Sequence, residues 1–510
     1  MTPLKVYFGD LTHDSIILVS DTIPINIGFI AGYAKKLFGS DIEVSLFKYP
    51  QAILDAIRSD PPDILALSNY SWNSNLSEFV ARRAKQANPD VVTVQGGTNF
   101  PHEPSQQAGF LAGRPATDIH TVFEGEVAFV NILRRILEAR DDGPGLYDAP
   151  IEGTVYIHPS TRESGEPVLV SADQPSRIRD LDDIPSPYLS GMMDGFFADG
   201  RLTPFLETNR GCPFKCTFCH TGADYFHKIN MFSTERVRDE IDYIARRVSA
   251  HGIVNLHLAD TNFGMYPRDR EICESLYRTH KDFGWPQQIM STTGKNNKER
   301  VIDITGILGN IFSVTMSVQS MDDAVLSNIK RSNIKLDHYV EVNKHLQKEG
   351  RNTNAELIIG LPGETRESFL RGVEQCIEAG VSTATIYTLM LLHGTEFQSP
   401  AYREKYGIKG KFRILPLNFG EYDGDRVFDF EEVGVETNAM SFDDYLYLRG
   451  FALMVETVHN GHIFEEFFRF ALSVGVGRAQ FLRRLYDNLQ DAPETVKSVV
   501  DGFMDETRSE

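Results

Sequence analysis

Apolar and polar positions along residues 1–145 form two kinds of segment that alternate regularly. Short apolar runs, typical of buried strands, are separated by stretches with the helical period of about 3.6 residues. The predicted strands are Lys5–Phe8, Ile42–Phe47, Ile64–Asn69, Val91–Val94 and His120–Phe123. The predicted helices are Ile27–Leu37, Ala52–Arg58, Ser77–Ala87 and Val127–Glu138. This βα alternation with brief connections predicts an α/β domain built on a doubly wound, Rossmann-like parallel sheet.

Polar residues and glycines gather at one predicted edge of this sheet. Ligands of such sheets bind outside the carboxyl ends of the strands. The segments predicted there are Asp10–His13, Ser68–Asn73, Gly96–Asn99 and Glu124–Glu126. The candidate cofactor contacts among them are Ser68, Trp72, Gly96, Gly97 and Glu124. No GxGxxG motif follows the first strand, which disfavours a dinucleotide as the ligand.

The pattern predicts a connection over residues 146–200, followed by a second α/β domain over residues 201–400. In the connection, Thr154–Ile157 and Val168–Val170 alternate like a small hairpin, and two prolines fix an extended path after it. The strands predicted in the second domain are Pro204–Thr208, Val254–Leu258, Gln288–Ser291, Ser313–Val318, Ala355–Ile359 and Ala384–Leu389. Six βα units are too few to close an eight-stranded barrel, so we predict an open, partial barrel of the TIM type. Its active site would lie at the carboxyl ends of the strands.

Residues 401–510 are predicted to be mainly helical, with helices at Asp443–Val458 and Glu465–Leu472. This region is dense in aromatic residues. Two interpretations are open for them: they form a core, or they cap the open barrel and shape a substrate pocket.

Composition narrows the class of protein. The chain has 510 residues, 41% of them hydrophobic and 24% charged, which is typical of a globular protein with several domains. Its net charge of −20 disfavours a nucleic-acid partner, which requires clustered Lys and Arg. Only five cysteines in so long a chain indicate a reducing compartment, and no signal peptide or membrane span is evident. We therefore expect a cytoplasmic protein.

Three of the five cysteines lie in one loop after the first predicted barrel strand. Cys212, Cys216 and Cys219 have the spacing CxxxCxxC, which lets three thiolates hold three irons of a [4Fe-4S] cluster and leaves the fourth iron open. Two other interpretations are weaker. A zinc site would need His220 as a cramped fourth ligand, and a redox pair of Cys216 and Cys219 would leave Cys212 without a role.

The run TNRGCPFKCTFC at residues 208–219 resembles the radical S-adenosylmethionine (SAM) superfamily. The similarity extends to Ile358–Thr365, whose sequence is IIGLPGET, and the linker motif Leu-Asp-Asp-Ile-Pro at 181–185 is also similar. The resemblance implies a (β/α)6 barrel and a [4Fe-4S] cluster that cleaves SAM to a 5′-deoxyadenosyl radical. It also implies a one-electron reductant such as flavodoxin or ferredoxin.

The resemblance further implies which strand ends hold SAM. The matching candidates are Asp260, Thr261, Ser317, Gln319, Arg331, Gly360 and Glu364. Relatives often carry an acidic residue where this chain has Gln319, which can hydrogen-bond ribose but carries no charge. Simpler interpretations remain: Asp260 as a turn residue, Arg331 as a solvated helix end and Glu364 as a helix cap.

Residues 1–145 resemble the cobalamin-binding domain that precedes many radical SAM enzymes. The similar pieces are Pro24–Gly28, Ser68–Asn73, Gln95–Gly97 and Glu124–Glu126. The DxHxxG motif, whose His ligates cobalt, is absent, and His13 has the wrong spacing to replace it. The resemblance then implies cobalamin held without a lower His ligand; the alternative is a vestigial domain that serves as a scaffold.

These implications together predict an enzyme that methylates an unactivated carbon of a small-molecule or peptide substrate. The alternatives are a cobalamin-independent radical rearrangement, oxidation or C–C coupling, and a non-catalytic iron–sulfur sensor. The sensor lacks support because the chain shows no basic patch for DNA. The sequence does not identify the substrate.

Overall fold

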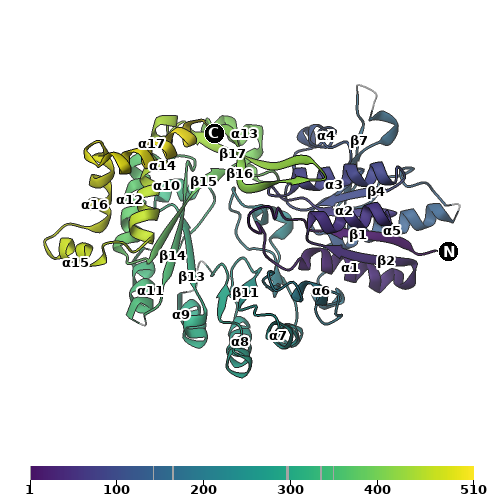
Figure 1. Cartoon of the computed structure of the whole chain (residues 1–510), viewed down its shortest axis with the longest axis horizontal. Helices are drawn as coiled ribbons and strands as arrows, with labels where there is room; N and C mark the ends of the chain where they lie inside the picture. Colours follow the sequence, from purple (N-terminus) through teal and green to yellow (C-terminus); the bar gives the residue numbers. More distant parts are fainter. Residues whose placement is uncertain are drawn as a thin grey trace.

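A computed structural model gives the structure of residues 2–141, 143–162, 166–294, 298–333, 336–348 and 350–509. Figure 1 shows an N-terminal sheet, in purple and blue, on one side of the molecule and the barrel strands, in teal and green, on the other. The predicted α/β class, with a parallel N-terminal sheet and a helical C-terminal region, is confirmed.

The N-terminal sheet has the strand order β2-β1-β3-β4-β5-β6-β7, of which β1 to β5 are parallel. The strands are β1 (Leu4–Gly9), β2 (Ile42–Phe47), β3 (Ile64–Ser68), β4 (Val92–Gly96), β5 (Ile119–Thr121), β6 (Thr154–Ile157) and β7 (Leu169–Ser171). The last two are the hairpin predicted in the connection; they pair antiparallel with β5 and with each other. The sheet therefore continues past residue 145, and the division into domains stays a prediction.

Helices cover both faces of this sheet, as the alternation predicted. They are α1 (Ile25–Phe38), α2 (Pro50–Ser59), α3 (Ser74–Ala87), α4 (Pro104–Ala112) and α5 (Gly125–Arg140). Apolar residues of α1 and α5 pack on one face, and those of α2 and α3 pack on the other. Helix α4 is the one the sequence analysis did not predict.

The six predicted barrel strands are present in order. They are β8 (Phe205–Leu206), β11 (Asn255–Leu258), β12 (Gln288–Met290), β13 (Val314–Gln319), β14 (Thr353–Ile359) and β15 (Thr383–Met390). They form two parallel groups, β8-β11-β12 and β13-β14-β15, which isolated bridges such as Ile289↔Phe312 connect. The helices between them are α7 (Thr234–Val248), α8 (Asp269–Phe283), α9 (Lys298–Leu308), α10 (Asp323–Asn328), α11 (Leu336–Lys348) and α12 (Arg366–Glu378). Short elements β9 (Asn209–Arg210), β10 (Asn230–Met231) and α6 (Asp194–Phe197) flank the first strand.

A long hairpin follows the barrel, where the sequence analysis predicted only helices. After α13 (Pro400–Tyr406), strands β16 (Lys409–Tyr422) and β17 (Asp425–Glu436) extend the sheet antiparallel to β15. The hairpin turns at Asp423-Gly424, both with positive φ, and an Asp-Gly pair between alternating strands is a strong hairpin signal. Figure 1 shows that it reaches across to α3.

The tip of the hairpin is fixed to the N-terminal domain by buried contacts. Tyr422 packs among apolar residues of β1, α2 and α3. Asp429 accepts hydrogen bonds from the His13 imidazole (2.9 Å) and from the backbone N–H of Asn75 (2.6 Å). The hairpin therefore ties the barrel to the N-terminal sheet through contacts distant in sequence from the connection along the chain.

The remaining C-terminal elements are helices, as predicted. They are α14 (Phe442–Met454), which continues as a π-helical segment (Val455–Asn460), α15 (Glu465–Ser473), α16 (Arg478–Asp487) and α17 (Glu494–Ser509). Their aromatic side chains Tyr445, Phe451 and Phe468 are buried against α12 and β14 residues, which supports the core interpretation for these three.

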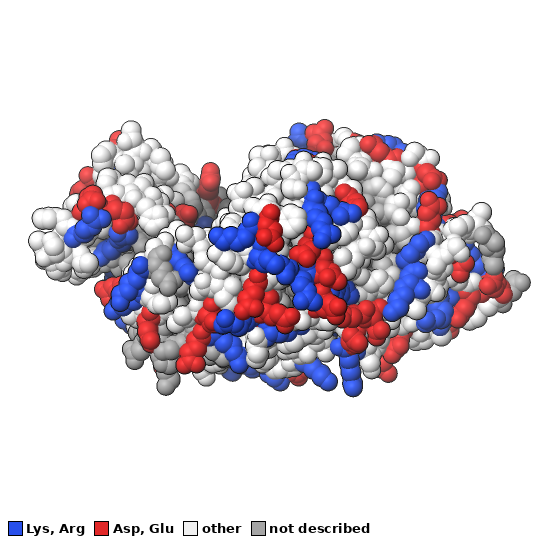
Figure 2. Space-filling view, turned by 90° about the horizontal axis from the view of Figure 1, so that it is seen from below, with Lys and Arg blue, Asp and Glu red and all other residues white. Residues whose placement is uncertain are grey.

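Two surface properties bear on partners. Among the described residues, no helix combines the length and the apolar character needed to cross a membrane. On the face shown in Figure 2, basic and acidic side chains are interspersed. Exposed ion pairs of the chain include Arg270–Asp303 and Arg278–Asp242. This face has no basic stripe of the kind that binds nucleic acid.

Candidate active site

The loop with the three cysteines follows β9 at the carboxyl end of the first barrel strand. Gly211 enters it at φ +113°, and a β-carbon there would lie 2.6 Å from the carbonyl oxygen of Phe226, so only glycine fits. Cys212 and Cys216 are buried, and Cys219 is partly exposed. The Phe218 ring packs near Phe397, 6.3 Å between ring centroids, and helps to exclude water from the loop.

Each of the three sulfur atoms lies near a hydrogen-bond donor. Asn262 Nδ2 donates to Cys212 Sγ at 3.3 Å, and the Thr221 hydroxyl lies 3.1 Å from Cys219 Sγ. The guanidinium of Arg331 lies 4.0 Å from Cys216 Sγ. Burial lowers the pKa of Arg331, while the neighbouring cysteine sulfurs act in the opposite direction. Donors and a cation around thiolates stabilise their negative charge and raise the potential of a cluster that they hold.

The other two cysteines have a different environment. Cys273 of α8 and Cys376 of α12 are fully buried among apolar side chains. Burial raises the pKa of the Cys376 thiol to about 12 and raises the pKa of Cys273 as well. Both are therefore protonated core residues. Among the described residues, no three His, Cys, Asp or Glu side chains lie close enough together to hold one metal ion.

Asp260, predicted to bind the amino group of SAM, lies after β11 and is buried. Its carboxylate accepts hydrogen bonds from the Thr208 backbone N–H (3.2 Å), the Thr208 hydroxyl (2.7 Å) and the Asn209 amide. Burial, together with the nearby Glu207 and Asp269, raises the pKa of Asp260 to about 7. The carboxylate thus holds the chain just before the cysteine loop, and Thr261 beside it lines a cavity.

The candidates after β13 lie close to the cysteine loop. Arg331 donates to the carbonyl of Ser317 as well as approaching Cys216, so it connects β13 to the loop. Gln319 has φ +65°, and its Oε1 is buried without a hydrogen-bond partner among the described residues. Ser317 donates its hydroxyl proton to Glu356 of β14.

The predicted SAM contacts after β14 are Gly360 and Glu364, and both have contacts within the protein. Gly360 has φ +92°, and a β-carbon there would lie 3.3 Å from the Gly434 carbonyl. Glu364 is fully buried and accepts hydrogen bonds from the hydroxyls of Ser320 (2.6 Å) and Ser368. Burial raises the pKa of Glu364. The N-cap of α12 is Thr365, which forms a capping box with Ser368, so the interpretation of Glu364 as the helix cap is wrong. A contact of Glu364 with SAM stays a prediction.

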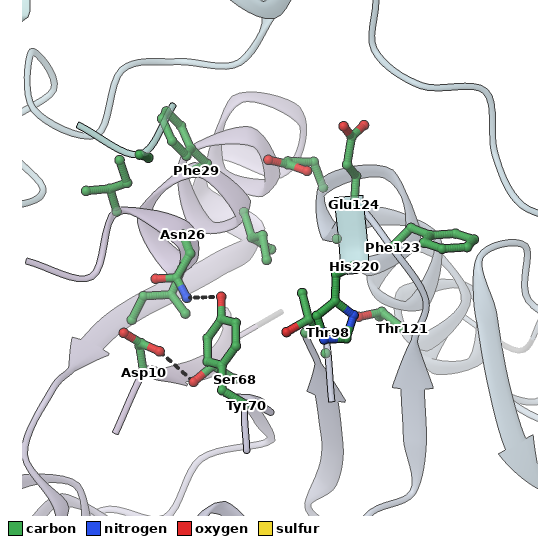
Figure 3. A pocket seen from close by; sticks show the side chains of 18 of the residues that line it. Asp10, Asn26, Phe29, Ser68, Tyr70, Thr98, Thr121, Phe123, Glu124 and His220 are labelled. Carbon is green, nitrogen blue, oxygen red and sulfur yellow. Dashed lines mark hydrogen bonds between the residues drawn. The ribbon is translucent and has the colours of Figure 1, made fainter. Parts of the chain in front are cut away.

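A cavity of about 570 Å³ separates the carboxyl edge of the N-terminal sheet from the cysteine loop. Its inner end is apolar and is formed by Phe8, Ala66, Val94 and Phe129, which lie between the sheet and helices α1 and α5. Its outer end is polar. Figure 3 shows Asn26 and Tyr70 on one side of the outer end and Thr98, Thr121 and His220 on the other.

The five predicted cofactor contacts of the N-terminal sheet all line this cavity. Ser68 donates to Asp10 Oδ1 at 2.6 Å, and the Trp72 ring stacks on Tyr70 with 4.5 Å between ring centroids. Glu124 accepts two hydrogen bonds from Arg177, at 2.7 and 3.0 Å. A β-carbon on Gly97 would lie 2.6 Å from the Asn69 carbonyl, and one on Gly96 would overlap the Thr121 hydroxyl.

Some cavity residues were not singled out from the sequence. Asn26 donates to the Tyr70 hydroxyl at 3.2 Å, and both side chains of this pair face the cavity (Figure 3). Gln95 is fully buried at the cavity wall, and both its side-chain polar atoms lack a partner among the described residues. Asn26 and Gln95 fall inside the segments similar to cobalamin-binding domains, so the signal was present; His220 was considered only as a zinc ligand.

The chain is similar to known proteins in sequence and in fold. Residues 206–376 match the family model of the radical SAM superfamily. The chain is 33% identical to the cobalamin-dependent radical SAM methyltransferase TokK of Streptomyces tokunonensis, over 96% of this chain and 70% of TokK. The chain belongs to the radical SAM superfamily. It therefore uses a [4Fe-4S] cluster and SAM, and the three loop cysteines are the predicted ligands of that cluster.

Two further similarities extend beyond the radical SAM barrel. The chain is 32% identical to 2-(S-pantetheinyl)-carbapenam-3-carboxylate methyltransferase of Streptantibioticus cattleyicolor, over 96% of this chain and 70% of that protein. The structure of the radical SAM methyltransferase TsrM from Kitasatospora setae, solved with cobalamin and a [4Fe-4S] cluster, has a TM-score of 0.60 at 14% identity. That similarity covers 88% of each chain and supports the arrangement of an N-terminal sheet before the barrel.

Some histidines of this radical SAM protein line the cavity, and others are held away from it. His13 does not line it; its Nδ1 lies 3.0 Å from the Tyr422 hydroxyl and its Nε2 binds Asp429. His120 is buried, and its Nε2 lies 3.2 Å from the Asn69 amide nitrogen. His102 and His220 line the cavity, and burial lowers the pKa of both.

Replacing Asp260 by alanine is expected to destabilise this radical SAM protein by about 2–4 kcal/mol, because buried donors on Thr208 and Asn209 lose their acceptor. Urea unfolding of the protein without SAM measures this. Asp239→Ala, on the exposed face of α7, is the control and should change stability by less than about 0.5 kcal/mol. If the carboxylate also holds the SAM amino group, the binding free energy of SAM becomes less favourable by roughly 1.5–3 kcal/mol. Unchanged affinity would limit Asp260 to positioning the cysteine loop.

Proposed function

We propose that this protein is a cobalamin-dependent radical SAM methyltransferase that methylates an unactivated carbon of a small-molecule substrate. The observation that carries the proposal is the cavity between the N-terminal sheet and the cysteine loop, because it adjoins both the loop, at Gly211, His220 and Thr221, and the polar edge of the sheet. The relatives named as cobalamin-dependent and carbapenam methyltransferases support it.

The residues present fit cobalamin. Its peripheral amides both donate and accept hydrogen bonds, and Gln95 offers an unpartnered amide at the cavity wall. Gly96 and Gly97 line the cavity at the β4 end, where a β-carbon would collide with Thr121 or Asn69, so the close packing of this part of the cavity wall requires glycine. The apolar inner end suits the benzimidazole part of the cofactor. Cobalamin would be held by Ser68, Trp72, Gln95 and Glu124 around the outer cavity.

The predicted cluster ligands are Cys212, Cys216 and Cys219, and SAM would lie across the strand ends near Thr261, Gln319 and Gly360. When bound, the cluster and SAM supply an adenosyl radical that removes hydrogen from carbon, and cobalamin supplies the methyl group that replaces it. The chain's own residues orient these groups and exclude water. Arg210, which pairs with Glu126 of the N-terminal domain at 2.7 Å, keeps the cysteine loop against the cavity.

The reaction also requires partners. A one-electron donor such as flavodoxin or ferredoxin would reduce the cluster, and the reducing conditions that the cluster needs make the cytoplasm the expected location. The interspersed charges in Figure 2 give no sign of a nucleic-acid substrate on that face.

Anaerobic reconstitution with iron, sulfide and hydroxocobalamin tests the proposal. We expect one cobalt per chain and, after addition of SAM with an isotope-labelled methyl group and a reductant, transfer of the label to the cobalamin fraction. A protein that retains its cluster and cleaves SAM but takes up no cobalt would overturn the methyltransferase proposal and leave a radical reaction without cobalamin.

The bound cobalamin is expected to have no protein nitrogen on cobalt, because His13 is held by Tyr422 and Asp429 away from the cavity. The electron paramagnetic resonance spectrum of the cob(II)alamin form should then lack nitrogen superhyperfine splitting. Splitting that disappears in His102→Ala or His220→Ala, the two histidines that line the cavity, would contradict this expectation. The matched control is His13→Ala, which should leave the spectrum unchanged.

A further inference from the structure

Helix α15 carries apolar side chains on two sides, and only one of these sides is packed. Phe468 and Ala471 are buried, and Phe468 belongs to a core that also contains residues of α12 and α16. Phe467 and Phe470, by contrast, are 45% and 64% exposed. A helix that is apolar all round is normally covered on every side. The exposed side of α15 therefore indicates a surface that a partner covers.

This apolar surface continues into the residues that precede and follow the helix. Its six members, here called the α15 surface, are Ile463 (46% exposed), Phe464 (67%), Phe467, Phe470, Leu472 (68%) and Val474 (61%). The three phenylalanines alone expose roughly 250–450 Å², and a monomeric protein rarely exposes a contiguous apolar patch larger than a few hundred Å². Figure 1 places α15 at the end of the molecule farthest from the N-terminal domain, and Figure 2 shows large uncharged areas at that end.

The helix that carries this surface is held firmly in place. Arg478 of α16 donates to Glu465 at 2.5 Å, lies 3.2 Å from Nδ1 of His459, and covers the Phe468 ring at 4.5 Å from its centroid. Phe464, directly before the helix, has φ +67°, a conformation that a bulky residue adopts only where its surroundings enforce it. The α15 surface is therefore preorganised, which lowers the entropy cost of association.

The charged residues beside the exposed phenylalanines form a self-complementary pair. Glu466 and Arg469 are 84% and 71% exposed, and they lie 2.7 Å apart on one helix. If two copies of α15 pack antiparallel about a two-fold axis between Phe467 and Phe470, Glu466 of each copy comes within reach of Arg469 of the other. Such an interface is isologous, since one surface serves both copies, and its charges attract across the axis.

We propose that the α15 surface is a homodimer interface, in which α15 packs antiparallel against α15 of a second copy of this chain. With the three aliphatic residues added to the phenylalanines, two copies bury on the order of 1,200 Å² in total, the lower end of specific interfaces. The interface lies far from the N-terminal domain, so the cavity beside that sheet stays open in both copies (Figure 1). The inference does not depend on cobalamin, SAM or methyl transfer.

Sedimentation equilibrium of the 510-residue chain between ~1 and ~100 µM tests the proposal. We expect a reversible dimer with twice the chain mass of 57.4 kDa. In Phe470→Glu, two carboxylates meet without partners near the two-fold axis, and the dissociation constant of the dimer should rise at least about a hundredfold. A monomer at all concentrations would overturn the proposal and leave the surface to a different protein, and a dimer retained by folded Phe470→Glu would also overturn it.

The matched control is Val168→Glu, which makes an equivalent change at a side chain that is 53% exposed in the N-terminal sheet, beside β7. It should dimerise as the unmodified protein does. Thermal unfolding establishes that each variant is folded. Hydrogen exchange of residues 463–474 gives a readout that needs no variant, because their protection should rise with protein concentration. Unchanged exchange at concentrations where the chain is dimeric would place the interface elsewhere.

Reversing the charges tests the antiparallel arrangement. Glu466→Arg brings like charges together across the axis and should raise the dissociation constant about tenfold, since the symmetry repeats the contact twice. Adding Arg469→Glu restores the attraction, so the double variant should dimerise about as tightly as the unmodified protein. A double variant that dimerises no better than Glu466→Arg alone would overturn this arrangement.

Discussion

Replacing Cys216 by alanine is expected to abolish the iron–sulfur absorption near ~400 nm and all cleavage of SAM. A cubane held by three protein thiolates loses one of its ligands, and the guanidinium that lies 4.0 Å from Cys216 Sγ, that of Arg331, is a cation that cannot replace it. Iron and sulfide analysis of the anaerobically reconstituted variant, with chromatographic detection of 5′-deoxyadenosine, measures both losses. Cys212→Ala and Cys219→Ala should behave in the same way.

The matched control is Cys376→Ala, because this thiol is buried in the core beside Phe369 and Val373 and is protonated. Its removal leaves a small cavity and costs stability, yet iron content and SAM cleavage should remain. Iron lost from Cys376→Ala with the fold intact, or retained in full by Cys216→Ala, would show that the three loop cysteines are not the ligands.

Filling the inner end of the cavity is expected to abolish cobalamin uptake. Ala66 of β3 lines this end together with Phe8, Val94 and Phe129. In Ala66→Phe, the added ring occupies space that the cofactor requires, because well-packed walls do not move aside for a second group of that size. Cobalt analysis after reconstitution with hydroxocobalamin should fall from about one per chain to none, while iron content is unchanged.

Ala112→Phe provides the control, since it adds the same ring on the exposed side of α4 and should leave cobalt binding intact. Thermal unfolding of both variants establishes that the fold is retained. Full cobalt uptake by a folded Ala66→Phe protein would mean that cobalamin does not enter the inner end of the cavity, which contradicts the proposed placement.

Several structural features could be predicted from local sequence alone. The strands of the N-terminal sheet and of the barrel are apolar runs between amphipathic helices, and this periodicity reflects burial on one face or on two. The CxxxCxxC spacing places three thiols on one loop whatever surrounds it, and helix α15 follows its own amphipathic pattern. The local backbone conformation also explains the glycine at position 211, because a φ of +113° is accessible to glycine and costly for other residues.

The β16–β17 hairpin shows where local pattern failed. Its exposed face carries Phe412, Ile414 and Phe430, so the strands lack the clean alternation of apolar and polar residues that marks a half-buried strand. Its Asp423-Gly424 turn was a sequence signal that the prediction overlooked. Its partner at the tip, the N-terminal domain some 400 residues earlier, could not be read from neighbouring residues, since His13 and Asp429 meet only through the tertiary fold.

The sequence by itself therefore determined the family, the order of the strands in the N-terminal sheet and the barrel, and the predicted cluster ligands, because periodicity and cysteine spacing are local properties of the chain. Only the tertiary structure decided what surrounds them. In the tertiary structure, Asp260 accepts hydrogen bonds from Thr208 and Asn209. Ser317 donates to Glu356 and accepts from Arg331. Residues of the N-terminal sheet and of the cysteine loop line one cavity. The physical reason is that hydrogen-bond partners and cavity walls come from strands distant in sequence, whose register and packing no single segment encodes.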